Sequence, residues 1–470
     1  MTCDLVIKDG KVVTPTGVLN GGVAIADGKF VAIGPDASLP SGRRELKLGG
    51  KILFPGLFDP HVHFGVGGKT FGDDTMLADF EQDTKECLIG GVTSIATTTL
   101  IGNDPLTDLF GRALRCGTGH SWCDFKLTSC VNNLEQVADI RGVVKSGGTS
   151  FKFFTGFIGP QAEAFGINKE GINPDLFYAA CKALKASGPA AFPMIHAEEP
   201  YLRGLLVDEM RRQGRRDFLT AWAETTPEWA ESVQVFTYGH ITNQFRLPLY
   251  PVHISSAHTV KTIRYLRQQG IPIVAETLAL FLCTTAPEVD AKGLGTKAKI
   301  QPPIRFEADR ESLWSAIKDG TIMVVGTDSL TYSSSFKEEV EFWDCRVGLN
   351  LQVADTLPLL FDEGINRGRI DLVTLARVLS ENGARLYGIY PQKGAIILGA
   401  DADLVVIDPD REATLGKSRY RGKTDYSIWE GRRVKGMPVM TLLRGNPVMQ
   451  DGEIVAKTMP GKHLGSATAG

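Results

Sequence analysis

The sequence contains none of the segments that would carry it into or across a membrane. No apolar run in its 470 residues approaches the ~18 residues needed to span a bilayer. Residues 1–4 do not form a basic segment followed by an apolar one, which is the usual form of a signal peptide. We therefore expect no transmembrane helix, no membrane partner and a cytoplasmic location.

Cysteine and net charge are also scarce. The eight cysteines include no CxxC pair, which favours reduced, buried thiols over a disulfide framework. Cys116, Cys123 and Cys130 are evenly spaced but fall on different predicted elements, so we expect no metal site there. A net charge of -3 gives no indication of a nucleic-acid partner.

Both ends of the chain have the pattern of short antiparallel strands. Asp9-Gly10 and Asp27-Gly28 separate apolar runs within residues 1–52, as in tight hairpins. Similar strands and turns return in 394–456, and we expect one composite β-sandwich domain built from 1–52 and 394–456. Residues 457–470 have little apolar content and are expected to be a tail, ordered only when docked on a partner.

The middle of the chain, residues 53–393, alternates apolar strands with amphipathic helices. Continuous apolar strands between helices are typical of a parallel sheet, and eight such units favour a TIM (β/α)8 barrel. The predicted strands are 52–59, 93–100, 125–131, 150–155, 190–196, 249–255, 271–277 and 321–327.

Metal-ligand side chains stand at the predicted carboxyl ends of these strands, where barrel enzymes place their active sites. His61 and His63 end the first strand, and side chains at i and i+2 of a strand point to the same side. His196, His253 and Asp328 end the fifth, sixth and eighth strands. Each alone could be an ordinary buried histidine or a helix-capping aspartate. Together they predict a site for zinc-like metals, since neutral imidazole is their commonest ligand.

Lys152, on the fourth strand between Phe151 and Phe153, is costly to bury as a cation. It must be paired, neutralised or modified. A neutral lysine can add carbon dioxide and become a carbamate, whose two oxygens can bridge two cations. Two metals ~3.5–4 Å apart hold a hydroxide and polarise a carbonyl. Asp328 could bind one metal, take the proton of that water and pass it to a leaving nitrogen.

Nine segments spread over nearly the whole chain carry a family resemblance. They are PGLFDPHVHF (55–64), GGVTSI (90–95), SFKFF (150–154), MIHAEE (194–199), VHISSA (252–257), ETLALFL (276–282), PPIR (302–305), GTDS (326–329) and GADADLVVIDP (399–409). The sequence resembles the dihydropyrimidinase/hydantoinase branch of the amidohydrolase superfamily. That family is a TIM barrel with a composite β-sandwich, hydrolyses cyclic amides such as dihydrouracil and hydantoins, and is usually a zinc-dependent homotetramer.

The resemblance implies a ligand set for two divalent metals. His61, His63 and Asp328 would hold one metal, His196 and His253 the other, and a carboxylated Lys152 would bridge them. Zinc is expected from the family, although manganese and cobalt also suit such ligands.

The sequence departs from the family at positions expected to contact the substrate. Phe157 stands where hydantoinases usually carry a tyrosine that donates to the substrate carbonyl, and losing such a donor costs on the order of 10²–10³ in rate. Either the metals alone stabilise the oxyanion, or another donor replaces the tyrosine. Gln301 and Ser329 replace a usual serine and histidine, and Gly348 ends the Arg-Val-Gly segment that replaces Asn-Gly.

The sequence thus predicts a metal-dependent hydrolase of a cyclic amide or imide, with Asp328 as the proton shuttle. Two alternatives stay open. The altered pocket is compatible with another C–N bond, as in allantoin or an open-chain amide. Dihydropyrimidinase-related scaffolds keep the fold without catalysis, but they lack the metal ligands that are all present here.

Overall fold

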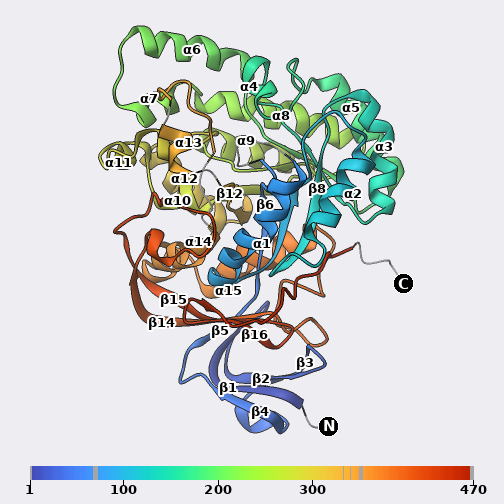
Figure 1. Cartoon of the computed structure of the whole chain (residues 1–470), viewed down its shortest axis with the longest axis vertical. Coiled ribbons are helices and arrows are strands. Elements are labelled where there is room, and N and C mark those ends of the chain that lie inside the picture. The colour runs from blue at the N-terminus through green and yellow to red at the C-terminus, as the bar shows by residue number, and fades with distance from the viewer. Residues whose placement is uncertain (1–2, 67–71, 332, 339, 349–352, 466–470) are drawn as a thin grey trace.

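The structure is a computed structural model that describes residues 3–66, 72–331, 333–338, 340–348 and 353–465. It contains a nine-stranded sheet and a curled parallel sheet covered by helices (Figure 1). None of the described helices is long and apolar enough to cross a membrane. The eight cysteines are free and buried, as the sequence predicts.

Strands from both ends of the chain form the nine-stranded sheet. Its order is β17-β16-β15-β14-β5-β1-β2-β3, with β4 paired to β1. The central contact joins β5 to β14, where Ile52 pairs with Ile407 and Pro55 with Leu404. The strands are β1 (Cys3–Thr14), β2 (Gly17–Ala26), β3 (Lys29–Gly34), β4 (Gly42–Lys47), β5 (Ile52–Pro55), β14 (Leu404–Thr414), β15 (Arg433–Leu443), β16 (Asn446–Gln450) and β17 (Glu453–Ile454).

The parallel strands follow one another in chain order. Six form the sheet β11-β10-β9-β8-β7-β6, and β12 pairs with β13. Isolated bridges join Leu249 to Ile273, beside β11 and β12, and Val62 of β6 to Ser329, after β13. The strands are β6 (Leu57–Val62), β7 (Val92–Thr98), β8 (Asp124–Cys130), β9 (Ser150–Phe153), β10 (Phe192–Ile195), β11 (Tyr250–Pro251), β12 (Ala275–Leu278) and β13 (Ile322–Gly326).

Helices lie between and after these strands and cover them (Figure 1). Side-chain caps fix several helix starts: Asn133, Asn173 and Ser256 each accept a hydrogen bond from a backbone N–H of the first turn. The helices are α1 (Asp73–Ile89), α2 (Leu106–Gly117), α3 (Leu134–Lys145), α4 (Gly159–Glu163), α5 (Pro174–Ser187), α6 (Pro200–Arg212), α7 (Phe218–Glu224), α8 (Glu228–Gln244), α9 (Ala257–Gln268), α10 (Ala279–Cys283), α11 (Ala286–Asp290), α12 (Glu307–Lys318), α13 (Ser334–Glu338), α14 (Val353–Leu360), α15 (Leu372–Ala376) and α16 (Asn382–Leu386).

One predicted strand, 52–59, is two strands in the structure. β5 belongs to the nine-stranded sheet and β6 to the parallel sheet, and Gly56 lies between them. A Cβ at Gly56 would lie 2.3 Å from Thr93 Oγ1 and 2.9 Å from Asp403 Cβ. The chain therefore passes from the nine-stranded sheet to the parallel sheet at a position where only glycine fits. A continuous apolar run in the sequence does not show that its two halves pair with different sheets.

The segment after residue 456 differs from the expected tail. His463 forms a parallel bridge with Phe125 of β8, and Leu464 donates its backbone N–H to Phe125 O at 2.8 Å. Lys126 Nζ donates to Leu464 O at 3.1 Å. Residues 457–465 are therefore placed by this chain's own strand rather than by a partner, because backbone pairing does not depend on apolar content. Residues 466–470 lie outside the described part.

Candidate metal centre and cavity

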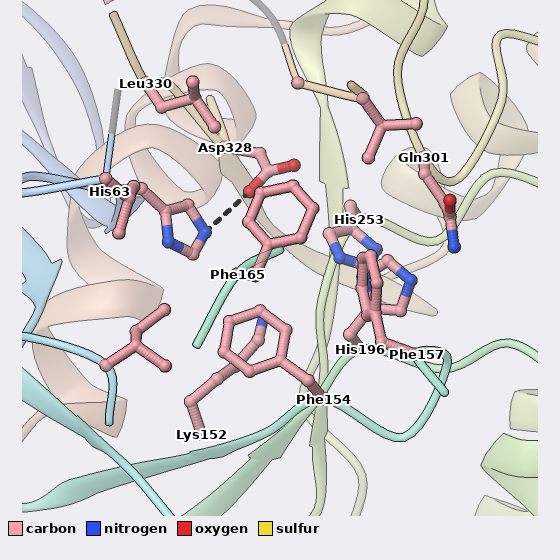
Figure 2. A pocket seen from close by; sticks show the side chains of 14 residues that line it. His63, Lys152, Phe154, Phe157, Phe165, His196, His253, Gln301, Asp328 and Leu330 are labelled. Carbon is pink, nitrogen blue, oxygen red and sulfur yellow. Dashed lines mark ion pairs between the residues drawn. The ribbon is translucent and has the colours of Figure 1, made fainter. Parts of the chain in front are cut away.

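The six predicted ligand residues converge at one end of the parallel sheet. His61 and His63 lie at the end of β6, and Lys152 is on β9. His196, His253 and Asp328 follow β10, β11 and β13 within two residues. Figure 2 shows five of them around one cavity. All six side chains are buried.

His61 lies at the centre of the closest group. Its Nε2 is 3.2 Å from each of three atoms: His63 Nε2, Lys152 Nζ and Asp328 Oδ1. His63 Nε2 is 3.0 Å from Asp328 Oδ1. Nitrogens of both rings and an oxygen of Asp328 lie within 4.8 Å of one another, so they could hold a single metal ion.

His196 and His253 form a second pair beside the first group. Their ring centroids are 4.5 Å apart, and the His253 ring is 5.5 Å from that of His61. His253 Nδ1 is buried without a hydrogen-bond partner in the described part of the chain. A buried nitrogen lone pair without a partner is costly, and a metal ion would satisfy it.

The backbone at two of these residues is unusual. His253 has φ 43° and Asp328 has φ 52°, in the left-handed region that residues other than glycine rarely adopt. Such conformations cost of order 1–3 kcal/mol and occur mainly where function requires a side chain to be aimed. Both residues lie two positions after strands of the parallel sheet, and their side chains lie close to the other candidate ligands.

Three further residues orient the histidine rings from outside. Glu276 Oε1 is 2.8 Å from His61 Nδ1, Thr98 Oγ1 is 3.2 Å from His63 Nδ1, and Glu198 Oε2 is 2.7 Å from His196 Nε2. In His61 and His63 the contact uses Nδ1 and leaves Nε2 facing the ligand group, as is usual for metal-bound histidine. The sequence pattern gives these residues no role, although Glu198 and Glu276 stand within the segments MIHAEE and ETLALFL.

Burial and neighbouring charges set the protonation of the group. Burial lowers the pKa of all four histidines, with a further contribution from Lys152. Although burial opposes its ionisation, His61 and His63 lower the pKa of Asp328 to about 2. Burial lowers the pKa of Lys152 to about 8, against the pull of Asp328 and Glu276. Neutral imidazoles, a carboxylate and an easily neutralised amine form a donor set that fits divalent metals.

The cavity beside these residues has a largely apolar wall. Three phenylalanines, Phe154, Phe157 and Phe165, lie on one part of it (Figure 2). Val66, Ile101, Leu330 and Val347 complete the apolar lining.

Three of the four predicted substrate contacts line this cavity: Phe157, Gln301 and Gly348. Ser329 does not line it. Its backbone O accepts from His63 N at 2.8 Å, and its side chain is buried. The Phe157 ring packs 4.7 Å from the His196 ring, between centroids, and offers no hydrogen-bond donor.

Comparisons with known proteins agree on one superfamily. Residues 229–448 match the model of the amidohydrolase family. A D-hydantoinase of Geobacillus stearothermophilus is 29% identical, over 99% of this chain and 97% of the relative. An allantoinase of Streptomyces avermitilis is 30% identical, over 96% of each.

Solved structures give the same result. An L-hydantoinase from Arthrobacter aurescens superposes with a TM-score of 0.88 at 25% identity, covering 99% of this chain and all of the other. A D-hydantoinase crystal structure gives 0.87 at 27% identity, over 98% of each. The fold and the ligand group therefore define a metal-binding hydrolase scaffold. The chain belongs to the amidohydrolase superfamily, in its hydantoinase branch.

Proposed function

We propose that this protein is a metal-dependent hydrolase that opens a cyclic amide or imide, of the dihydropyrimidine or hydantoin kind, at a C–N bond. The observation that carries the proposal is the convergence of four histidines, an aspartate and a buried lysine at one end of the parallel sheet, where all but His61 line one cavity. The hydantoinase names of the relatives support the same substrate class.

We propose that His61, His63 and Asp328 hold one divalent metal and that His196 and His253 hold a second. Lys152, carboxylated on Nζ, would bridge them; its burial and its 3.2 Å distance from His61 support this role. Zinc is the metal that the histidine-rich donor set favours, with manganese or cobalt as substitutes. When bound, such metals polarise a carbonyl and make water nucleophilic near neutral pH.

The chain's own residues would do the rest of the chemistry. The apolar wall would limit the water around a bound substrate ring beside the ligand group. Asp328, ionised at neutral pH, would accept a proton from the attacking water as the C–O bond forms. It would then return that proton to the ring nitrogen as the C–N bond breaks. The product is an opened chain with a carboxylate at one end and the released N–H group at the other.

A second candidate is hydrolysis of a different C–N bond, as in allantoin or an open-chain amide. Its support is the allantoinase relative at 30% identity and the donor-free Phe157 ring in the cavity. A non-catalytic scaffold is disfavoured because all six ligand side chains are present and adjacent.

A hydrolysis panel would separate these candidates. Metal-loaded, bicarbonate-treated enzyme would be given dihydrouracil, hydantoin, a bulky 5-substituted hydantoin, a cyclic imide, allantoin and an open-chain amide. Turnover of the ring amides is expected. Turnover of allantoin or the open-chain amide alone would favour the second candidate, and stoichiometric metal content would argue against a scaffold.

We also propose that 53–393 form a closed (β/α)8 barrel and that 1–52 with 394–456 form the β domain. The bridges Val62–Ser329 and Leu249–Ile273 and the passage at Gly56 support this division.

A cytoplasmic homotetramer remains our prediction from the family resemblance and the free cysteines. Light scattering of the purified protein would test the tetramer.

A further inference from the structure

A buried acid outside the ligand group holds the turn that carries His253. The backbone of His253 has φ 43°, which a residue other than glycine keeps only where its surroundings enforce it. Glu231, on α8, binds the chain two and three residues later. Its Oε1 accepts from Ser255 N at 2.9 Å and Ser255 Oγ at 2.8 Å. Its Oε2 accepts from Ser256 N at 3.2 Å and Ser256 Oγ at 3.0 Å. One carboxylate therefore fixes both residues.

Arg305, from the segment before α12, joins the same network. Its Nε donates to Ser255 Oγ at 2.8 Å and its Nη1 to Thr226 O at 2.7 Å. Glu231 is 1% exposed and Arg305 is 4% exposed. Burial raises the pKa of Glu231, and the charge of Arg305 opposes that rise. A buried acid and a buried cation thus meet on one serine hydroxyl beside the turn.

The backbone of the turn is bound along residues 253–256. His253 N donates to Glu276 Oε1 at 3.2 Å, and Ile254 N donates to Glu276 O at 2.7 Å. Glu231 accepts from the next two N–H groups. Glu276 therefore holds the first half of the turn and Glu231 the second half, which leaves the left-handed residue little freedom to relax.

The turn sets the place of the His253 ring. Its centroid is 4.5 Å from that of His196 and 5.5 Å from that of His61, and Figure 2 shows the rings of His196 and His253 next to each other. His253 Nδ1 is buried without a hydrogen-bond partner in the described part of the chain. A change in the turn would move this ring relative to His196, because the two rings are carried by different strands.

We propose that Glu231 and Arg305 are positioning residues for the second metal: they hold residues 253–256 in the conformation that keeps the His253 ring beside His196. The inference rests on the two-metal site proposed above. Both residues act through the backbone of the turn and the Ser255 hydroxyl. The group of His61, His63 and Asp328 is carried by β6 and the segment after β13. Loss of the network should therefore weaken binding of the second metal and spare the first.

The first test is the zinc content of Glu231→Gln in the full-length protein. An amide nitrogen cannot accept, so the N–H of Ser255 or Ser256 loses its acceptor. We expect the affinity for the second zinc ion to fall about 10–100-fold, as is typical when a residue supporting a metal ligand is changed. Dialysis against increasing chelator should leave one zinc ion per chain where the wild type keeps two.

Two further variants calibrate that measurement. His253→Ala removes the ligand itself and gives the reference for a chain that holds one zinc ion. Glu228→Gln makes the same chemical change at the exposed first residue of α8 and should keep both zinc ions. The rise in Tm on adding zinc should be smaller in Glu231→Gln than in Glu228→Gln, because only a bound metal contributes to it.

Arg305→Met and Ser255→Ala test the rest of the network. Arg305→Met removes the cation and both donors, and it should also lose the second zinc ion. Ser255→Ala removes the shared hydroxyl but keeps the backbone N–H that Glu231 accepts, so its loss of affinity should be smaller. A purely structural network would lower the Tm of the metal-free variants and leave both zinc affinities unchanged.

The outcomes separate this inference from the proposed function. Folded Glu231→Gln and Arg305→Met that bind two zinc ions with wild-type affinity would overturn it. Equal weakening of both zinc ions would overturn it as well, because the effect would not be confined to His253. If neither variant folded, wild-type zinc affinity in Ser255→Ala would be the contrary result. A wild-type protein that bound no metal would instead refute the proposed function.

Discussion

Two lysines are buried on neighbouring strands of the parallel sheet, and burial lowers the pKa of each to about 8. Lys126 lies near the start of β8 and donates to Leu464 O at the end of the chain. Lys152 lies 3.2 Å from His61 Nε2. Desolvation is therefore common to both lysines, and only the position of Lys152 makes its amine useful to a metal site.

Lys152→Ala should remove both bound metal and turnover, because the ligand group loses the side chain that we propose bridges its two halves. Metal analysis and hydrolysis assays check this, with Lys126→Met as the control that should keep its metal. Full activity of Lys152→Ala without an added short carboxylic acid would rule out the bridging role.

Asp328→Asn should keep the fold and lose hydrolysis, because an amide cannot take up the proton of the attacking water. We expect kcat to fall on the order of 10²–10⁴. Circular dichroism would confirm folding, and Asp410→Asn, an exposed partner of Lys435, is the control. Near-normal turnover of Asp328→Asn would exclude it as the shuttle.

The convergence of the six candidate ligand residues could be predicted from the sequence because their signal is local: each lies in or just after an apolar strand, and His61 and His63 are two residues apart. The residues that hydrogen-bond to the site from outside could not be predicted in this way. Gln161 contacts Gln301 across 140 residues of chain and Arg203 contacts Gln161 across 42, and nothing in the sequence near these positions indicates either contact. The placement of Ser329 also depends on backbone pairing with β6, which a motif does not reveal.

At the scale of elements, α1 presents a row of buried acids to the segment that precedes β15. Glu86 accepts the backbone N–H groups of Arg421 and Gly422, and Asp79 pairs with Lys423. Burial raises the pKa of Glu86 to about 7, although the two backbone donors oppose the shift. The protonated acid is thus the stable form at this contact below neutral pH.

Glu86→Gln should flatten the pH dependence of stability. The pKa of Glu86 is about 7 in the folded protein and 4.5 as its ordinary value, so its stabilisation is complete below pH 4.5 and is lost as the pH rises through 7. Glutamine cannot ionise. Between pH 5 and 8 the Tm of Glu86→Gln should fall less than that of the wild type and should exceed it at pH 8.

The control for that measurement is Asp74→Asn, an exposed change on the same helix, which should follow the wild-type curve. Identical pH curves for Glu86→Gln and the wild type would mean that Glu86 is ionised throughout.

The sequence predicts the type and order of the strands and helices better than it predicts where each one begins and ends. The alternation of strand and helix predicts the parallel sheet, but β11 contains only Tyr250 and Pro251, where the sequence predicts 249–255. After Pro251 the chain leaves regular pairing to reach the left-handed backbone at His253. The left-handed backbone at His253 interrupts the strand there, and strand propensity alone cannot reveal it.

At the scale of the whole molecule, a buried cluster of charges joins the two sheets. Lys393 Nζ lies 2.6 Å from Asp124 Oδ2, at the start of β8, and 2.7 Å from Asp403 Oδ2, just before β14. Asp401 is 3.0 Å from the same nitrogen, and Arg444 is 2.6 Å from Asp124. One ammonium therefore balances carboxylates from both parts of the fold.

Lys393→Met should destabilise the protein by about 3–5 kcal/mol, because it leaves buried carboxylates without their cation. Thermal or urea unfolding would measure the loss. Lys435→Met, which breaks an exposed pair with Asp410, should leave Tm unchanged. Equal stability of the two variants would show that Arg444 alone suffices to balance Asp124.

The pairing of β5 with β14 has a consequence for synthesis of the protein. Pro55 lies beside Leu404, so the first five strands leave the ribosome roughly 350 residues before the strand that covers them. At ~5–20 residues per second this interval lasts about 20 to 70 s. During that time the apolar edge of β5 is open to other nascent chains. Production of this protein should therefore depend on chaperones that shield its amino-terminal strands until the last fifth of the chain is made.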